Sequence, residues 1–193
     1  SRAGRDTLDV LRTLERLDAA HYQPLNGAQY PDSDLGQGLK QVACLVRAEV
    51  GMEVACLDKG GWDTHVTQGT ESGWMPLQME DLSKSMAAFA ADLGSEMSRV
   101  TVIAMTEFGR RIAENAGLGT DHGHGGAMFL LGGAVRGGKV HAKWPGLDHP
   151  VGPGDLAVTT DYRDVLAEIL RKRMDLGNTA QIFAGHQAAP LGI

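Results

Sequence analysis

The sequence lacks several features that would assign it quickly to a class of protein. Its lysines and arginines form no cluster, and 24 acidic residues outnumber 18 basic ones. This balance argues against nucleic acid as a partner, because binding to a phosphate backbone requires concentrated positive charge. No apolar run approaches the roughly 20 residues that a transmembrane helix needs. The sequence therefore predicts neither nucleic-acid binding nor a transmembrane segment.

Motifs of several common chemistries are also missing. The sequence has no P-loop, no Gly-x-Gly-x-x-Gly after a strand, no Gly-x-Ser-x-Gly elbow and no Cys-x-x-Cys pair. These absences argue against nucleotide binding and serine-hydrolase chemistry. Only two cysteines occur, Cys44 and Cys56, and both lie in apolar segments. We expect two buried free thiols rather than a disulfide.

What is present fits a folded globular domain, with 42% hydrophobic and 22% charged residues. Apolar positions spaced three and four apart predict helices over about residues 6–20 and 75–97. Two further helices are predicted, one capped by Ser33 and stopped by Gly51, and one capped by Thr160. We expect the methionines of the helix over 75–97 to pack in the core rather than line a binding groove.

Short apolar runs at residues 52–57, 100–105 and 127–131 predict strands, and residues 139–142 predict a fourth, shorter one. Hydrophobicity in these runs is continuous rather than alternating, which is typical of strands covered on both faces. We therefore expect a single α/β domain over residues 1–193, a mostly parallel sheet with helices on both faces. In such sheets polar sites lie beyond the carboxyl ends of the strands, where two polar motifs occur here.

The first polar motif is Gly-Gly-Trp-Asp-Thr-His at residues 60–65. Asp63 and His65 are two positions apart, so in extended backbone their side chains share a face. A carboxylate and an imidazole together on a loop suit a hard or borderline divalent cation. In the alternative interpretation, Asp63 caps a turn and His65 is merely exposed.

The second polar motif is Thr-Asp-His-Gly-His-Gly-Gly at residues 120–126. His122 and His124 share one side of an extended loop, and the glycines permit bends and a close approach of the backbone to a ligand. Asp121 faces the other way unless the loop bends, and it could instead orient a ligating imidazole. The alternative interpretation is a flexible glycine loop with solvated histidines.

Glu107 lies at the end of a predicted strand, shortly before Arg110 and Arg111. Two interpretations stand side by side: Glu107 is a metal ligand, or it forms an ion pair with one of the arginines. An arginine at this position could bind the paired oxygens of a phosphate or sulfate group. Arg110 is therefore the candidate catalytic residue.

Through these motifs the sequence resembles the DUF1501 family of bacterial proteins, which is placed near the alkaline phosphatase and sulfatase superfamily. The resemblance covers about residues 30–170. Besides the two polar motifs, the positions that carry it are Tyr30-Pro31, Leu39-Lys40, residues 107–111 (Glu-Phe-Gly-Arg-Arg), Gly119 and residues 160–163 (Thr-Asp-Tyr-Arg).

The superfamily resemblance implies an alkaline phosphatase-like fold, with its N-terminal part missing, and a two-metal site that activates an attacking oxygen. Asp63 and His65 resemble one Asp-His ligand pair, and His122 resembles a later histidine ligand. Where the superfamily has another Asp-His pair, this chain has Glu107-Phe108, so the second metal is expected to be weak or missing. An alternative match takes residues 121–123 as the Asp-His-Gly of the superfamily.

The resemblance also implies that the first strand and the nucleophile of the family precede Ser1. Full-length members often begin with a secretion signal, which implies an exported parent protein, although the chain itself leaves its location open. A partial sheet with an exposed edge would be prone to pair with a second copy, so a homo-oligomer is expected.

These observations lead to the hypothesis of a metal-dependent hydrolase of small anionic phosphate or sulfate esters. The expected cofactor is a divalent metal, zinc before manganese, calcium or magnesium. The candidate ligands and supporting residues are Asp63, His65, Glu107, Asp121, His122 and His124. Two alternatives are a non-catalytic binding or surface-associated domain that keeps the fold, and a structural site for a single metal.

Overall fold

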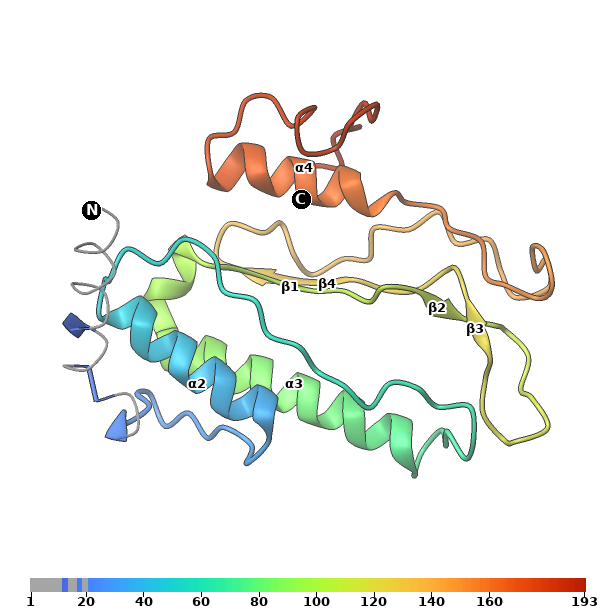
Figure 1. Cartoon of the computed structure of the whole chain (residues 1–193), viewed down its shortest axis with the longest axis horizontal. Coiled ribbons are helices and arrows are strands. Elements are labelled where there is room, and N and C mark those ends of the chain that lie inside the picture. Colours follow the sequence, from blue (N-terminus) through green and yellow to red (C-terminus); the bar gives the residue numbers. More distant parts are fainter. Residues whose placement is uncertain (1–11, 14–16, 19–20) are drawn as a thin grey trace. The chain divides into compact units, whose positions relative to one another are not determined.

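The computed structural model describes residues 12–13, 17–18 and 21–193 (Figure 1). The predicted helix over about residues 6–20 lies largely outside the described residues. The chain divides into two compact units, Ser1–Ser98 and Arg99–Ile193, and the single domain over residues 1–193 stays a prediction. Among the described helices none is long and apolar enough to cross a membrane, as the sequence predicted.

In the described part of the first unit, helices α2 and α3 pack against each other (Figure 1). Helix α2, Asp34–Arg47, begins after Ser33, whose Oγ accepts a 3.1 Å hydrogen bond from the amide of Gly36. This N-cap is the predicted one. The helix ends at Arg47 rather than near Gly51, because Glu49 already adopts a left-handed φ of 50°. Its buried positions recur every four residues along one face: Leu35, Leu39 and Ala43.

Helix α3, Trp74–Leu93, confirms the helix predicted over residues 75–97, although Gly94 breaks it with a φ of 54°. A 3-10 helix, η2, continues over Gly94–Arg99. The buried side chains are concentrated in the C-terminal half of α3, where Phe89 is 2% and Leu93 is 1% exposed. Met97 is buried, whereas Met79 is 38% exposed. The prediction that the methionines pack in the core therefore holds for only part of the helix.

The second unit contains two short antiparallel sheets (Figure 1). Strand β1, Thr101–Ala104, pairs with β4, Phe129–Gly132, so that Val102 lies opposite Leu131. Strand β2, Gly109–Arg110, pairs with β3, His122–Gly123, and this pairing closes a hairpin. The β2–β3 pairing brings the two ends of the loop over residues 111–121 together.

The predicted fold class is wrong. In the described part of the chain the strands form two separate two-stranded antiparallel sheets, not a mostly parallel sheet with helices on both faces. The runs at residues 52–57 and 139–142 form no strand, and Val54 and Val140 are 64% and 89% exposed. Continuous hydrophobicity does not by itself require burial on both faces, because antiparallel pairs such as β1–β4 can leave one face open.

The two cysteines are both free, as predicted, but they differ in burial. Cys44 is buried in α2, whereas Cys56 is exposed in the segment that forms no strand. The expectation of two buried thiols is therefore correct only for Cys44.

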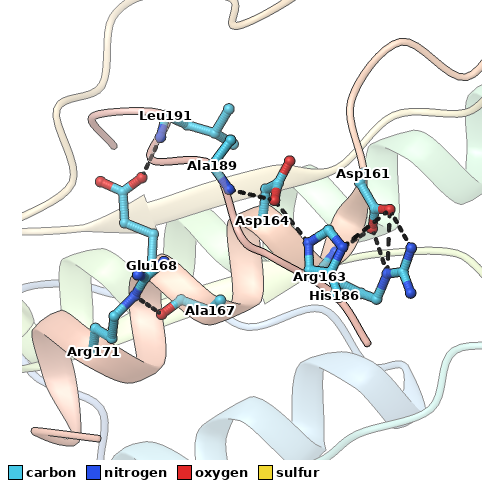
Figure 2. A network of polar contacts seen from close by, with 9 residues as sticks. All are labelled: Asp161, Arg163, Asp164, Ala167, Glu168, Arg171, His186, Ala189 and Leu191. Atoms are coloured by element: carbon cyan, nitrogen blue, oxygen red, sulfur yellow. Dashed lines mark hydrogen bonds and ion pairs between the residues drawn. The ribbon is translucent and has the colours of Figure 1, made fainter. Parts of the chain in front are cut away.

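Helix α4, Tyr162–Arg173, is capped by Asp161, one residue later than the predicted cap, Thr160. Asp161 accepts a 2.9 Å hydrogen bond from the amide of Arg163, and the guanidinium of Arg163 beside it lowers the pKa of this carboxyl to about 2. Acidic side chains of α4 also hold the segment that follows the helix (Figure 2). Asp164 accepts hydrogen bonds from the His186 ring and the Ala189 amide, each 2.8 Å long.

Candidate functional site

The loop that carries Asp63 and His65 is anchored by the residue between them. Thr64 is only 2% exposed, and its hydroxyl donates a 2.8 Å hydrogen bond to Oε1 of Gln68. The backbone at Asp63 is not extended, because the amide of Thr64 donates a 3.0 Å hydrogen bond to the carbonyl of Trp62 and closes a tight turn around Asp63. The side chains of Asp63 and His65 are nevertheless both exposed beside the buried Thr64. That they share one face of an extended chain stays a prediction.

Asp63 and His65 face each other at ligand distance. Nε2 of His65 lies 3.1 Å from Oδ1 of Asp63, and the two side chains are 40% and 71% exposed. Two ligand atoms that bind one zinc ion at about 2.0–2.2 Å lie roughly 3–3.6 Å apart in tetrahedral or octahedral geometry. The separation fits a shared ion without rearrangement. It also fits a simple contact between an imidazole and a carboxylate.

An open hollow of about 440 Å³ adjoins the start of the same loop and includes Gly60 in its lining. Lys59 lines it too, and its Nζ donates a 2.6 Å hydrogen bond to Oδ2 of Asp81. Burial alone would raise the pKa of Asp81, but the hydrogen bonds from Lys59 and Ser33 outweigh it and lower that pKa. Lys59 and Asp81 lie outside both polar motifs, so no sequence pattern indicated them.

The remaining predicted site residues lie in the second unit, on or beside the β2–β3 hairpin. Nη1 of Arg110 donates a 2.8 Å hydrogen bond to the carbonyl of Thr120. Asp121 accepts a 3.0 Å hydrogen bond from Nδ2 of Asn115 and lies 3.8 Å from Nη1 of Arg111. The hairpin thus holds Asp121 through neighbours on its own loop.

Two aromatic rings meet next to the hairpin. The ring centroids of Phe108 and His122 are 4.2 Å apart, with the planes tilted by 36°. Glu107, the residue before, is exposed, while Arg111 lies near Asp121 and Asp155. The ligand role of Glu107 stays a prediction.

His124 has a partner that the sequence did not indicate. Its Nδ1 lies 2.5 Å from Oδ2 of Asp155, a residue that is only 2% exposed. The two residues are 31 positions apart. The sequence feature that indicated a turn before Asp155 is the pair of glycines Gly152 and Gly154. In the structure they adopt φ values of 53° and 122°.

The glycines in and near the second motif allow other backbone segments of the same chain to pack closely against them. A Cβ at Gly109 would lie 1.7 Å from the carbonyl oxygen of Gly125, and a Cβ at Gly125 would lie 2.6 Å from that of Leu156. At Gly123 a Cβ would lie 2.6 Å from the carbonyl carbon of Arg110. The predicted close approach was to a ligand, whereas the observed approach is to backbone of the same chain and joins the hairpin to the segment at Leu156.

Comparison with known proteins gives one match. Residues 12–193 match the model of a family described as "Protein of unknown function (DUF1501)". Among the curated proteins and the solved structures compared with the chain, none matches it.

Proposed function

The chain belongs to the DUF1501 family, and on that premise we propose that it is a metal-dependent hydrolase of phosphate or sulfate esters. The observation that carries the proposal is the outward-facing pair of Asp63 and His65, whose ligand atoms are 3.1 Å apart. One carboxylate oxygen and one imidazole nitrogen suit zinc, and manganese, calcium and magnesium are the other candidates. The relationship to the alkaline phosphatase and sulfatase superfamily is part of this proposal.

In this proposal the metal and the ester are bound by different residues. Asp63 and His65 bind the metal, which when present lowers the pKa of a bound water and polarises the ester. Arg110 binds an oxygen of the anionic ester through its guanidinium, which is suited to paired oxygens. Glu107, Asp121, His122 and His124 stay predicted ligands or supporting residues.

A second candidate function is a binding domain with a single metal and no catalysis. It is favoured by the contact between Phe108 and His122, whose ring centroids are 4.2 Å apart. Phe108 stands where the resemblance implies a histidine ligand, and a phenyl ring cannot bind a metal ion. A domain of this kind would bind metal without hydrolysing an ester.

Hydrolysis of p-nitrophenyl phosphate and p-nitrophenyl sulfate, measured with each candidate metal and with chelator, separates the two functions. In this proposal the attacking oxygen is a water activated by the metal rather than a side chain of the chain. We therefore expect hydrolysis that requires metal and is lost in His65→Ala. The matched control is His21→Ala, because His21 also contacts a carboxylate, Asp18, at 2.7 Å in an exposed setting. Metal binding without hydrolysis of either ester would support the binding domain, and the absence of both would overturn both functions.

A homo-oligomer is also part of the proposal. In the described residues, β1 and β4 pair only with each other, so each offers a second, unpaired edge to a second copy. Light scattering coupled to size-exclusion chromatography tests it, and a monomer at all concentrations would contradict it.

A further inference from the structure

The segment over residues 52–60, between α2 and α3 in the chain, runs extended (Figure 1). It contains no turn or bend, and it is bounded by Gly51 and Gly61, whose φ values are 78° and 88°. In the part of the chain that the structure describes, its backbone N–H and C=O groups make no hydrogen bond. These groups are therefore available to a neighbouring strand, as at the edge of a sheet.

Alternate side chains of this segment contact the two helices. A Cβ at Gly38 of α2 would lie 3.1 Å from Cδ2 of Leu57, and Nζ of Lys59 donates its 2.6 Å hydrogen bond to Asp81 of α3. Because side chains of an extended chain alternate between two faces, the residues between these two point away from the helices. Three residues of that other face are exposed: Val54, Cys56 and Asp58.

The segment is complementary to itself in one register. When two copies pair antiparallel around a twofold axis, opposite side chains share a face, so one residue must lie opposite its own copy. If that residue is Cys56, Glu53 lies opposite Lys59 of the second copy, and the two charges attract. If it is the residue before or after Cys56, Glu53 instead lies opposite Leu57 or Gly61. The Lys59 ammonium has further N–H donors besides the one that it gives to Asp81.

We propose that residues 52–60 pair antiparallel with the same residues of a second copy of the chain, in the register centred on Cys56. The pairing supplies hydrogen-bond partners to a backbone that has none in the described structure. The second copy is the partner because it brings Lys59 opposite Glu53. This interface is independent of the proposed hydrolysis, and it lies on the first unit rather than on the edges of β1 and β4.

Oxidative cross-linking of the wild-type chain tests the register. Opposite residues of an antiparallel pair have Cα atoms about 4.5–5.5 Å apart, within the roughly 4.4–6.8 Å that a disulfide spans. Under mild oxidation we expect a covalent dimer, and none in Cys56→Ser, which keeps the buried Cys44.

A matched control moves the thiol along the same face. In the double variant Val54→Cys/Cys56→Ser, residue 54 would lie opposite residue 58 of the second copy, roughly 14 Å along the strand from its own copy. We expect little cross-linking of this variant. Cross-linking as fast as that of the wild type would reveal random collision and overturn the register.

The dissociation constant of the reduced dimer, measured by analytical ultracentrifugation, tests the charge pair. Glu53→Lys replaces an attractive cross-strand pair by two like charges, so we expect the dissociation constant to rise by about threefold or more. Glu71→Lys is the matched control, because it makes the same charge change at another exposed residue of the first unit. Equal effects of the two substitutions would overturn the pairing of Glu53 with Lys59.

The outcomes separate this interface from the oligomer proposed above. A dimer that does not cross-link through Cys56 and is unchanged by Glu53→Lys would overturn this inference alone and leave the edges of β1 and β4 as the interface. A monomer at all concentrations would overturn both interfaces. Neither result bears on metal binding or ester hydrolysis, which are measured separately.

Discussion

The hydroxyl of Tyr30 donates a 2.8 Å hydrogen bond to Oδ2 of Asp92, whose side chain is fully buried. Oδ1 of the same carboxylate accepts hydrogen bonds from the Tyr22 hydroxyl, at 2.9 Å, and from the Leu25 amide, at 2.8 Å. Nε of Arg47 lies 3.7 Å away and supplies the opposite charge. One carboxylate on α3 thus fixes the irregular segment before α2.

Tyr30→Phe should lower the free energy of unfolding by about 1.5–3 kcal/mol, because it removes a hydrogen bond to a buried charged group. Urea denaturation followed by tryptophan fluorescence measures the change. The matched control is Tyr162→Phe, since Tyr162 is 51% exposed, and its effect should stay within about 0.5 kcal/mol. Equal effects of the two substitutions would show that the buried network contributes little.

The same network predicts instability at alkaline pH. Burial and the hydrogen bond to Asp92 raise the pKa of Tyr22 from 10.0 to about 12, and the same causes raise the pKa of Tyr30. A raised pKa stabilises the folded state fully below pH 10.0, and this stabilisation is lost as the pH rises to about 12. We expect the free energy of unfolding to fall across this interval, and to fall less in Tyr22→Phe. An identical pH dependence in the variant would contradict the assignment.

Glu168 should control the order of the final residues. Its carboxylate, on a residue that is 4% exposed, accepts hydrogen bonds from the amides of Leu191, Gly192 and Ile193 at 2.6, 3.0 and 3.0 Å. In Glu168→Gln we expect amide exchange at these three residues to accelerate about tenfold or more, since such hydrogen bonds to charged groups contribute about 1.5–3 kcal/mol. Glu80→Gln, which changes an exposed ion pair with Lys84, should leave the exchange unchanged.

This contact should also depend on pH in a defined direction. Burial alone would raise the pKa of Glu168, but the Lys172 ammonium and the backbone amides outweigh it and lower the pKa below 4.5. A lowered pKa stabilises the fold above pH 4.5, and this stabilisation is lost as the pH falls through the pKa of the folded state. The protection factors of residues 191–193, which correct exchange for its intrinsic pH dependence, should therefore fall in acid for the wild type and much less for Glu168→Gln.

Gly109→Ala should destabilise the hairpin that carries His122. The new Cβ would lie 1.7 Å from the carbonyl oxygen of Gly125, so one of the two backbone segments must move. Overpacking of this kind typically costs about 1–3 kcal/mol. Gly137→Ala is the matched control, because no atom lies within 4 Å of a Cβ built there. Equal melting temperatures of the two variants would contradict the close contact.

Local signals in the sequence predicted local structure well. Ser33 is predictable as an N-cap because a hydroxyl side chain directly before a helical pattern of apolar residues is a local signal. The cap of α4 is Asp161, one residue after the predicted Thr160. The proximity of Asp63 and His65 was predictable for the same reason, since the two residues are neighbours in sequence, although the backbone between them turns rather than extends.

Long-range relationships were not predictable in this way. The antiparallel pairing of β1 with β4 depends on which strand edges meet, and apolar content does not contain that information. The contact of His124 with Asp155 joins residues 31 positions apart through a turn, and neither residue type indicates the other. The exposure of Val54 likewise depends on whether a distant segment of the chain packs against it.

The most direct test of the proposed metal site is the metal content of the purified protein, measured by atomic spectroscopy after preparation without chelators. We expect at least one zinc, manganese, calcium or magnesium ion per chain in the wild type and in His21→Ala, and a clear loss in His65→Ala. A wild-type protein that binds none of these metals stoichiometrically, or a His65→Ala variant that keeps the full content, would contradict the role of Asp63 and His65.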